Sequence, residues 1–209
     1  ISYRLVGSEM CIRDRIKIVY LHAREIIERL GDGSLDIGFS GYDLLKESEL
    51  NIQNKVIINK KLNYGNATLV VAVPDEWIDV QTLADLEEIS FDFKDNKKSR
   101  LRVATKYPNL TKEFLFSKGV TQFKLVPSLG ATEVYPFTGS SEILTDITST
   151  GETLKANNLR ILKDGNILKS TAILMSNKKS SNEIGLKKIL NLLSSCLLYT
   201  SPSPRDGTK

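Results

Sequence analysis

The sequence predicts an α/β protein with two lobes and mostly parallel sheets. Apolar segments of strand length alternate with amphipathic segments of helix length, which is typical of this class. This alternation occurs in two series, one before and one after a basic loop at residues 94–100. We therefore expect two lobes with a cleft between them.

The two ends of the chain are set aside first. One DNA segment, read on opposite strands, can encode both LVGSEMCIRD near the start and CLLYTSPSPRD near the end, and it resembles a sequencing-library adapter. We interpret residues 1–14 and 196–209 as adapter-like sequence, with residue 15 at the join. Both cysteines, Cys11 and Cys196, fall in these ends, so neither a disulfide nor a metal pair is argued from them.

Before the basic loop, the pattern predicts strands at 16–21, 35–41 and 66–74 and helices at 24–30, 42–48 and 80–89. The helix at 24–30 would place Ile26, Ile27 and Leu30 on one face. The run NATLVVAVP is apolar throughout, which is typical of a strand that is buried on both faces.

After the basic loop, the same alternation predicts strands that begin at 101, 122 and 166 and helices at 110–119 and 183–193. Gly119 stands at the end of the first of these helices, where a glycine commonly ends a helix. Strand and helix thus continue to alternate up to the C-terminal adapter-like sequence.

The composition excludes several kinds of partner. Of the 29 basic and 25 acidic residues, four and three lie in the adapter-like ends, which leaves a net charge of +3. This charge is too mild to indicate a nucleic-acid surface. No apolar run reaches the ~18 residues of a transmembrane helix. The absence of cysteine outside the ends fits a reducing cytoplasm, so we expect a cytoplasmic protein without a nucleic-acid or membrane partner.

The stretch DITSTGETL, residues 146–154, carries the functional signal. The first amides of a helix lack partners and attract anions, and Gly151 would let the backbone approach a phosphate closely. Ser149, Thr150 and Thr153 could add hydroxyl donors. The alternative is that Ser149 or Thr150 only caps the helix. Asp146 stands at the end of the preceding strand, where it could accept hydrogen bonds from sugar hydroxyls, and this favours a sugar-phosphate site.

The spacing D-x3-T-G-x-T resembles the loop with which phosphoribosyltransferases hold phosphoribosyl pyrophosphate (PRPP). The wider stretch EVYPFTGSSEILTDITSTGETLKANNL resembles the signature of the ATP phosphoribosyltransferase family, and RVATKYPNLTKEF and LDIGFSGYDLL look like two further blocks of it. The residues that match the signature are Glu133, Pro136, Gly139, Asp146, Thr150, Gly151, Thr153, Leu154 and Asn157.

The resemblance implies the fold of type II periplasmic binding proteins. The first lobe would then consist of 15–78 and 163–195, and the second of 79–162. It also implies transfer of the phosphoribosyl group to N1 of the adenine of ATP, the first step of histidine biosynthesis. The residues expected to bind PRPP are Glu133, Asp146, Ser149, Thr150, Gly151, Glu152, Thr153 and Leu154. Those expected to line the ATP side are Arg24, Ser40, Gly41 and Tyr107.

No catalytic nucleophile and no metal ligand from the protein are expected, since Mg²⁺ would arrive with the pyrophosphate. The family's N-terminal strand, which carries basic substrate contacts, is replaced by adapter-like sequence, so we expect little turnover from the chain as written. The sequence looks closer to the short form of the family, which implies a homo-oligomer with a regulatory subunit resembling histidyl-tRNA synthetase. The alternative function is a non-enzymatic receptor for a small metabolite with the same two-lobed fold.

Overall fold

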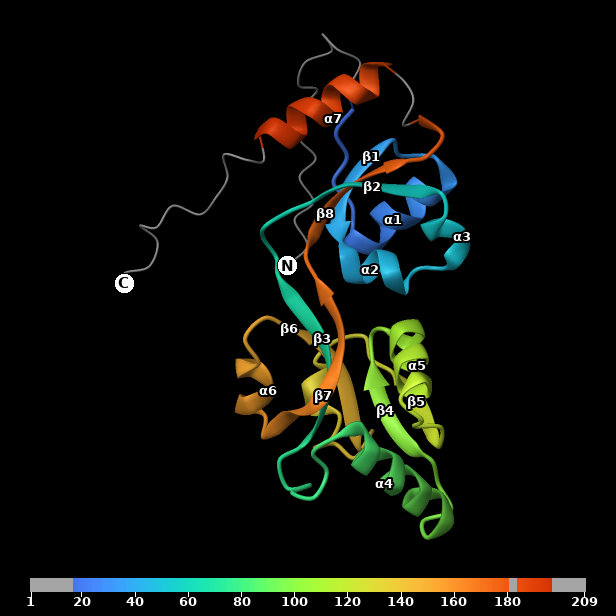
Figure 1. Cartoon of the computed structure of the whole chain (residues 1–209), viewed down its shortest axis with the longest axis vertical. Helices are drawn as coiled ribbons and strands as arrows, with labels where there is room; N and C mark the ends of the chain where they lie inside the picture. Colours follow the sequence, from blue (N-terminus) through green and yellow to red (C-terminus); the bar gives the residue numbers. More distant parts are fainter. Residues whose placement is uncertain (1–16, 181–183, 197–209) are drawn as a thin grey trace, which may run out of the picture.

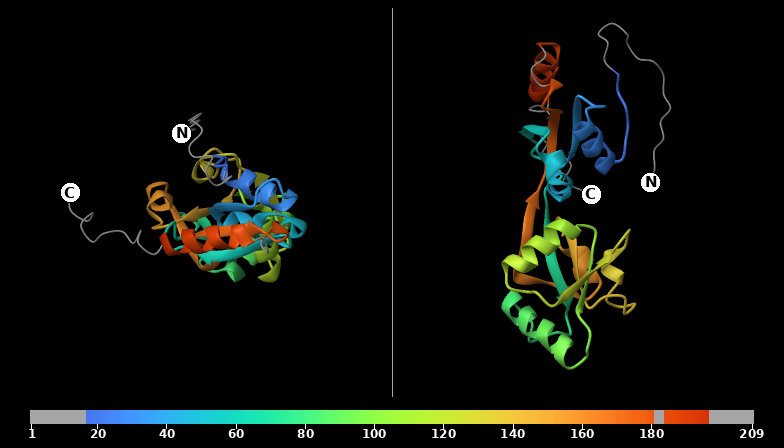
Figure 2. Two further views of the ribbon diagram at one scale, coloured as in Figure 1. Left: turned by 90° about the horizontal axis from the view of Figure 1, so that it is seen from above. Right: turned by 90° about the vertical axis from the view of Figure 1, so that its right-hand side faces the viewer.

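The computed structural model describes residues 17–180 and 184–196, so the adapter-like ends predicted at 1–14 and 196–209 lie outside the described residues except for Cys196. Two sheets with their own helices are stacked along the long axis of the molecule, and two extended segments run between them (Figures 1 and 2). None of the described helices has the length and apolar character that crossing a membrane requires.

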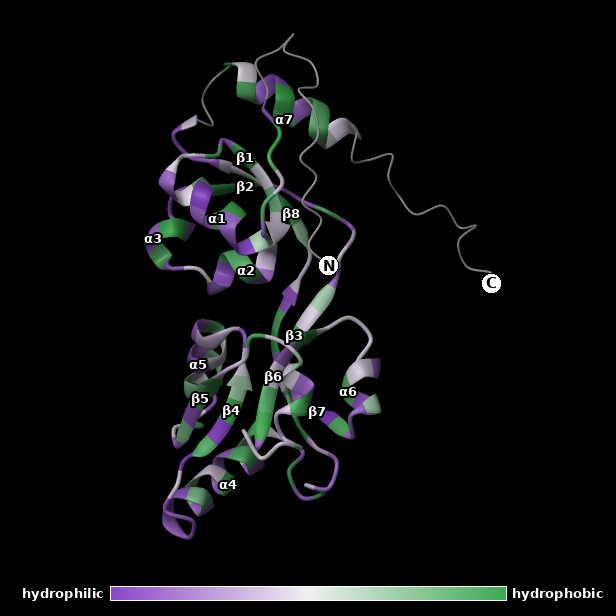
Figure 3. Ribbon diagram, turned by 180° about the vertical axis from the view of Figure 1, so that it is seen from behind, coloured by the Kyte–Doolittle hydropathy of each residue, from purple (hydrophilic) through white to green (hydrophobic). Residues whose placement is uncertain are grey.

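The first sheet has three strands in the order β1-β8-β2. They are β1 (Ile37–Gly41), β2 (Val56–Lys61) and β8 (Ala172–Asn177), and both pairings are antiparallel. The helices α1 (Ala23–Asp32), α2 (Tyr42–Glu47) and α3 (Leu50–Gln53) form a core with Ile173 and Met175 of β8. On the other face, α7 (Ile184–Cys196) packs on Leu174 through its apolar side, which alternates with polar residues (Figure 3).

The second sheet has five strands in the order β5-β4-β6-β3-β7. They are β3 (Ala67–Pro74), β4 (Leu101–Thr105), β5 (Phe123–Pro127), β6 (Ile143–Thr148) and β7 (Leu159–Ser170). β4 pairs in parallel with β5 and β6, whereas β3 pairs antiparallel with β6 and β7. The α/β class is confirmed, but the expectation of mostly parallel sheets is wrong.

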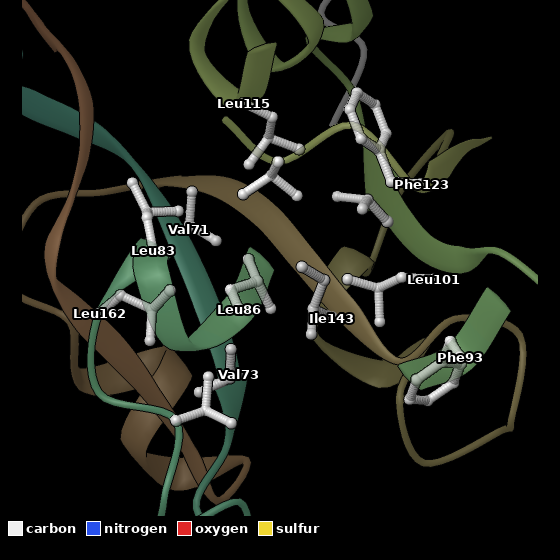
Figure 4. Packing of buried hydrophobic residues seen from close by; sticks show 13 residues of the cluster. Val71, Val73, Leu83, Leu86, Phe93, Leu101, Leu115, Phe123, Ile143 and Leu162 are labelled. Atoms are coloured by element: carbon white, nitrogen blue, oxygen red, sulfur yellow. The ribbon is translucent and has the colours of Figure 1, made fainter. Parts of the chain in front are cut away.

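The error has a physical cause in β3. Its continuous apolar run predicts a strand that is buried on both faces, which is common in parallel sheets, yet any central strand with helices or loops on both faces needs the same composition. Val71 and Val73 face the main core, which is shown in Figure 4. Val70 and Ala72 face a second cluster on the opposite side of the sheet. Burial on both faces is therefore compatible with either strand direction.

The helices of the second lobe are α4 (Leu83–Asp95), α5 (Pro108–Ser117) and α6 (Glu152–Ala156), with a 3-10 turn η1 at Thr132–Val134. α4 begins with a capping box, in which the side chain of Thr82 accepts from the N–H of Asp85 and the side chain of Asp85 accepts from the N–H of Thr82. It runs six residues beyond the predicted end at 89, which shortens the basic loop.

The strand predicted at 16–21 is not formed over residues 17–21, which adopt no regular secondary structure; residue 16 lies outside the described residues. The strand β2 and the first half of β7 were not predicted. β3 and the part of β7 after residue 162 pair within the five-stranded sheet, whereas the sequence-based division placed 67–74 and 163–170 in the first lobe. The chain therefore passes between the sheets at 62–66 and at 171.

Candidate functional site

The site predicted from the sequence lies where three parallel strands end. The carboxyl ends of β5, β4 and β6 meet at one edge of the second sheet, and ligands of open α/β sheets bind at such edges. The residues at this edge are Lys106 and Tyr107 after β4, Asp146 near the end of β6, and Glu133 in the turn η1 that follows β5.

The loop after β6 has the form expected of a phosphate-binding loop. Gly151 adopts the left-handed conformation, with φ of 78°, at the start of α6. Its N–H donates to Oγ1 of Thr148 at 2.8 Å, and the N–H of Glu152 makes a long bond of 3.4 Å to Oγ1 of Thr150. Ser149, Thr150, Glu152 and Thr153 are exposed, so the start of the helix is open to solvent. Leu154 is 3% exposed and anchors the helix on the sheet.

Asp146 is a partly buried carboxylate beside this loop. Its side chain is 15% exposed, and Nζ of Lys106 lies 3.9 Å from Oδ1. Oδ1 also accepts from the N–H of Ile147 at 2.9 Å. Burial raises the pKa of Asp146, and the nearby charge of Glu133 adds to the rise, while the Ile147 N–H and Lys106 oppose it. The ionised form is thus destabilised in the folded chain without ligand.

The partial burial of the Asp146 carboxylate predicts that it lowers the stability of the fold at neutral pH. Because its folded-state pKa is raised, Asp146 stabilises the fold below its unfolded-state pKa of about 3.9, and that contribution is lost as the pH rises through the folded-state value. We expect Asp146→Asn to raise the free energy of unfolding at pH 7 by roughly 0.5–2 kcal/mol, and the gain should shrink toward pH 4. Urea denaturation across this range is the measurement.

The control for this prediction is Asp79→Asn, at a solvent-exposed carboxylate. A gain for Asp146→Asn that is independent of pH, or equal to that of the control, would contradict the assignment.

Three buried threonines support the segment after β4. The hydroxyls of Thr105, Thr111 and Thr145 lie 2.6–3.0 Å from one another and form a closed triangle. Oγ1 of Thr105 also accepts from the N–H of Tyr107 at 2.9 Å. Because each hydroxyl is buried and satisfied, the cluster fixes the direction in which the chain leaves the sheet at Lys106.

Tyr107 links the second lobe to the first rather than lying open in a cleft. Its side chain is 6% exposed, and its O–H donates to Oδ2 of Asp43 at 2.8 Å. Burial raises the pKa of Tyr107, and the hydrogen bond to Asp43 adds to the rise. Oδ1 of Asp43 accepts from the hydroxyl of Ser170 at 2.5 Å. This carboxylate therefore joins α2, β7 and the segment after β4.

Two further contacts lie in the same interlobe region. The carboxylate of Glu47 accepts from the N–H groups of Asn109 and Leu110 at 2.9 and 3.0 Å, in the first turn of α5. The guanidinium of Arg24 donates to the carbonyl oxygen of Lys106 at 2.5 Å. Arg24, which the sequence places on the ATP side, thus bonds the backbone of the other lobe in this structure.

Ser40 and Gly41 are the last two residues of β1, directly before α2 in the first lobe. The hydroxyl of Ser40 donates to the carbonyl oxygen of Ala23 at 2.9 Å and is largely buried. Gly41 precedes α2, and a Cβ there would come within 2.4 Å of the carboxylate of Asp43. Glycine at this position thus makes room for the Asp43 side chain.

The residues that the structure describes line at least two pockets. One of about 300 Å³ lies between the lobes, and Arg24, Glu47, Pro108 and Asn109 are among its lining residues. The other, of about 420 Å³, is lined by residues such as Trp77 and Phe93 near α4, away from the interlobe contact (Figure 1). Neither pocket is lined by the loop at 148–152, which is an open surface feature.

The sequence reasoning singled out Glu133, Asp146 and the loop, and the structure brings them to one edge of the sheet. It missed Lys106, although this residue stands inside the quoted block RVATKYPN. Asp43 and Glu47 are not among the site residues that the sequence predicts. The partners of these side chains come from distant parts of the chain, so no local pattern could have identified them.

Comparison with known proteins gives the family. The ATP phosphoribosyltransferase (HisG) family matches residues 22–195. A protein named ATP phosphoribosyltransferase from Nitrobacter winogradskyi is 43% identical over 192 residues, which are 92% of this chain and 58% of the relative. One of the same name from Brucella melitensis biotype 2 is 45% identical over 177 residues, 84% of this chain and 77% of that relative. The chain thus spans less than two thirds of the first relative and about three quarters of the second.

Solved structures agree on the fold. The ATP phosphoribosyl transferase (HisG:HisZ) complex from Thermotoga maritima matches with a TM-score of 0.64 and 27% identity, over 85% of this chain and 76% of that one. The arginine-bound form of truncated ArgBP from T. maritima matches with a TM-score of 0.52 and 16% identity, over 86% and 76% of the two chains. That second likeness shows the fold alone, an α/β fold like that of amino-acid-binding proteins. By its sequence and its fold, the chain belongs to the ATP phosphoribosyltransferase family.

Proposed function

We propose that this chain carries the substrate sites of an ATP phosphoribosyltransferase, a pentosyltransferase that joins ATP and PRPP in the first step of histidine biosynthesis. The observation that carries the proposal is the open loop after β6. Gly151 stands in the left-handed conformation at its helix start, the flanking hydroxyls are exposed, and Asp146 lies on the strand before it.

On this proposal, residues 149–154 bind the 5-phosphate of PRPP. A phosphate oxygen is a stronger acceptor than the hydroxyl of Thr150, so it would replace the long bond that this hydroxyl makes to the N–H of Glu152. Asp146 and Glu133 would accept hydrogen bonds from the ribose hydroxyls. The partial burial of the Asp146 carboxylate is consistent with this role, because hydrogen bonds from the ribose hydroxyls would stabilise its ionised form.

The ATP side would be formed by Arg24, Ser40, Gly41 and Tyr107, next to the interlobe contact. N1 of the adenine attacks C1 of the ribose, and the bond from C1 to the pyrophosphate oxygen breaks. The chain's contribution is to position two anionic substrates and to stabilise the departing charge, so no side-chain nucleophile is assigned.

Mg²⁺ would neutralise charge on the leaving pyrophosphate. Across residues 17–180 and 184–196, no group of three His, Cys, Asp or Glu side chains is arranged to hold a metal ion. Asp146 and Glu133 offer two carboxylates at the site, so pyrophosphate oxygens and water would supply most of the ligands.

Calorimetric titration of the chain tests the proposal. We expect PRPP with Mg²⁺ and ATP with Mg²⁺ each to bind, and arginine not to bind. The rival function, a metabolite receptor of the same fold, predicts the opposite result. Binding is the readout, because it tests each half of the site separately. Failure of PRPP to bind would reject the proposed function.

The proposal extends to assembly and location. The T. maritima neighbour was solved as a HisG:HisZ complex, and this supports a second, HisZ-like subunit for this chain. The proposed assembly is a homo-oligomer of this chain with such a regulatory subunit, which would resemble histidyl-tRNA synthetase. Both proposed substrates are cytoplasmic metabolites, so the proposed location is the cytoplasm. Size-exclusion chromatography of the chain with and without such a subunit would test the assembly.

A further inference from the structure

The charges at the sheet edge are unbalanced for a ligand that is itself an anion. Asp146 and Glu133 are close enough for their charges to interact, and Glu152 stands exposed in the first turn of α6. PRPP carries a phosphate and a pyrophosphate, so it would meet three carboxylates. The ammonium group paired with Asp146 at this edge is that of Lys106.

The backbone that carries Lys106 is held from two sides. Its carbonyl oxygen accepts from Arg24 of the first lobe at 2.5 Å. The following N–H, that of Tyr107, donates to the buried hydroxyl of Thr105. The starting point of the side chain is therefore fixed by both lobes, while its head group remains free to move on a flexible stem of four carbons.

The pair with Asp146 is suited to exchange. At 3.9 Å the two atoms are beyond hydrogen-bonding distance, and one third of the Lys106 side chain is exposed. Because the two groups are not hydrogen-bonded, a ligand with a stronger charge can replace Asp146 as the partner of Lys106, while ribose hydroxyls become donors to Asp146. A phosphate group is such a ligand.

We infer that Lys106 exchanges Asp146 for a phosphate group of bound PRPP and so acts as a substrate-binding residue. The inference rests on the proposed function. When Lys106 turns to the phosphate, Asp146 is released to accept from the ribose hydroxyls. One ammonium thus balances the carboxylate in the empty site and the substrate anion in the occupied site.

The test is calorimetric titration of the whole chain and of Lys106→Met with three probes: PRPP with Mg²⁺, ribose 5-phosphate, and ATP with Mg²⁺. We expect Lys106→Met to weaken PRPP binding by about 10-fold to 100-fold, as for loss of a charged hydrogen bond, and to change ATP binding less than threefold. The dependence of PRPP affinity on salt should also become weaker, which a merely structural residue would not cause.

Two variants serve as controls. Lys112→Met removes an exposed lysine of α5 and should leave all three affinities within twofold. Lys106→Arg keeps the charge and should recover most of the affinity for PRPP. Thermal melting of each variant checks that the fold is retained.

The probes also identify whether Lys106 contacts the 5-phosphate or the pyrophosphate of PRPP. Weakened binding of both PRPP and ribose 5-phosphate supports a contact with the 5-phosphate, and weakened binding of PRPP alone supports a contact with the pyrophosphate. If wild type binds PRPP and Lys106→Met binds it equally well, the inference is overturned while the proposed function stands. If wild type does not bind PRPP, the proposed function fails, and the role of Lys106 fails with it.

Discussion

Replacing Thr150 and Gly151 together with alanine is expected to weaken PRPP binding at least 100-fold and ATP binding less than threefold. The variant loses the hydroxyl of Thr150, and it forces a Cβ onto a residue with φ of 78°. The second change costs about 1–2 kcal/mol in the left-handed conformation. The loss of a hydrogen bond to a charged group costs about 1.5–3 kcal/mol, and every 1.4 kcal/mol is tenfold in affinity.

The chain offers a matched control for this variant. Gly33, which ends α1 in the first lobe, also has a positive φ, of 87°, and is exposed. Gly33→Ala should therefore introduce similar backbone strain without reducing PRPP affinity. Equal loss of PRPP and ATP binding in the Thr150 and Gly151 variant would argue against the assigned pocket.

The second large effect is expected at the interlobe contact. Tyr107→Phe removes the hydroxyl that donates to Asp43 and leaves a carboxylate that is only 6% exposed with fewer donors. Loss of a partner from a buried charged group costs about 1.5–3 kcal/mol. We expect a decrease of that size in the free energy of unfolding, measured by urea denaturation.

Tyr135→Phe is the control, because the hydroxyl of Tyr135 makes only a long, exposed bond of 3.5 Å to the carbonyl oxygen of Pro127. It should change the free energy of unfolding by less than about 0.5 kcal/mol. If the two variants had the same stability, the contact between Tyr107 and Asp43 would not contribute to holding the lobes.

The local sequence pattern predicted those helices and strands whose buried face follows from the spacing of their own apolar residues. The helix α1 is an example, because Ile27 and Leu30 lie on one face and Gly33 ends it in the left-handed conformation. The segment at 17–21 is the opposite case. Its apolar residues favour a strand, but a strand also needs a neighbouring strand to pair with, and no local pattern reports whether one is present.

The same distinction applies to the site. Asp146 and Gly151 were predicted because their spacing within one loop carries the chemistry. The pair between Lys106 and Asp146 depends on the register of β4 against β6, in which Thr105 lies opposite Thr145. The bond between Tyr107 and Asp43 depends on how the lobes are oriented. Neither register nor orientation is encoded in a short stretch, so these contacts needed the structure.

The two passages between the sheets restrict how the lobes can move. The passages are tied to each other, since the N–H of Leu62 donates to the carbonyl oxygen of Ala172 at 2.8 Å and the N–H of Ala172 donates to that of Tyr64 at 3.1 Å. Because the two segments are hydrogen-bonded to each other, a swing of one lobe against the other would bend both of them together, at residues 62–66 and 171. Such a swing would separate Arg24 from Lys106 and Asp43 from Tyr107 in one concerted step.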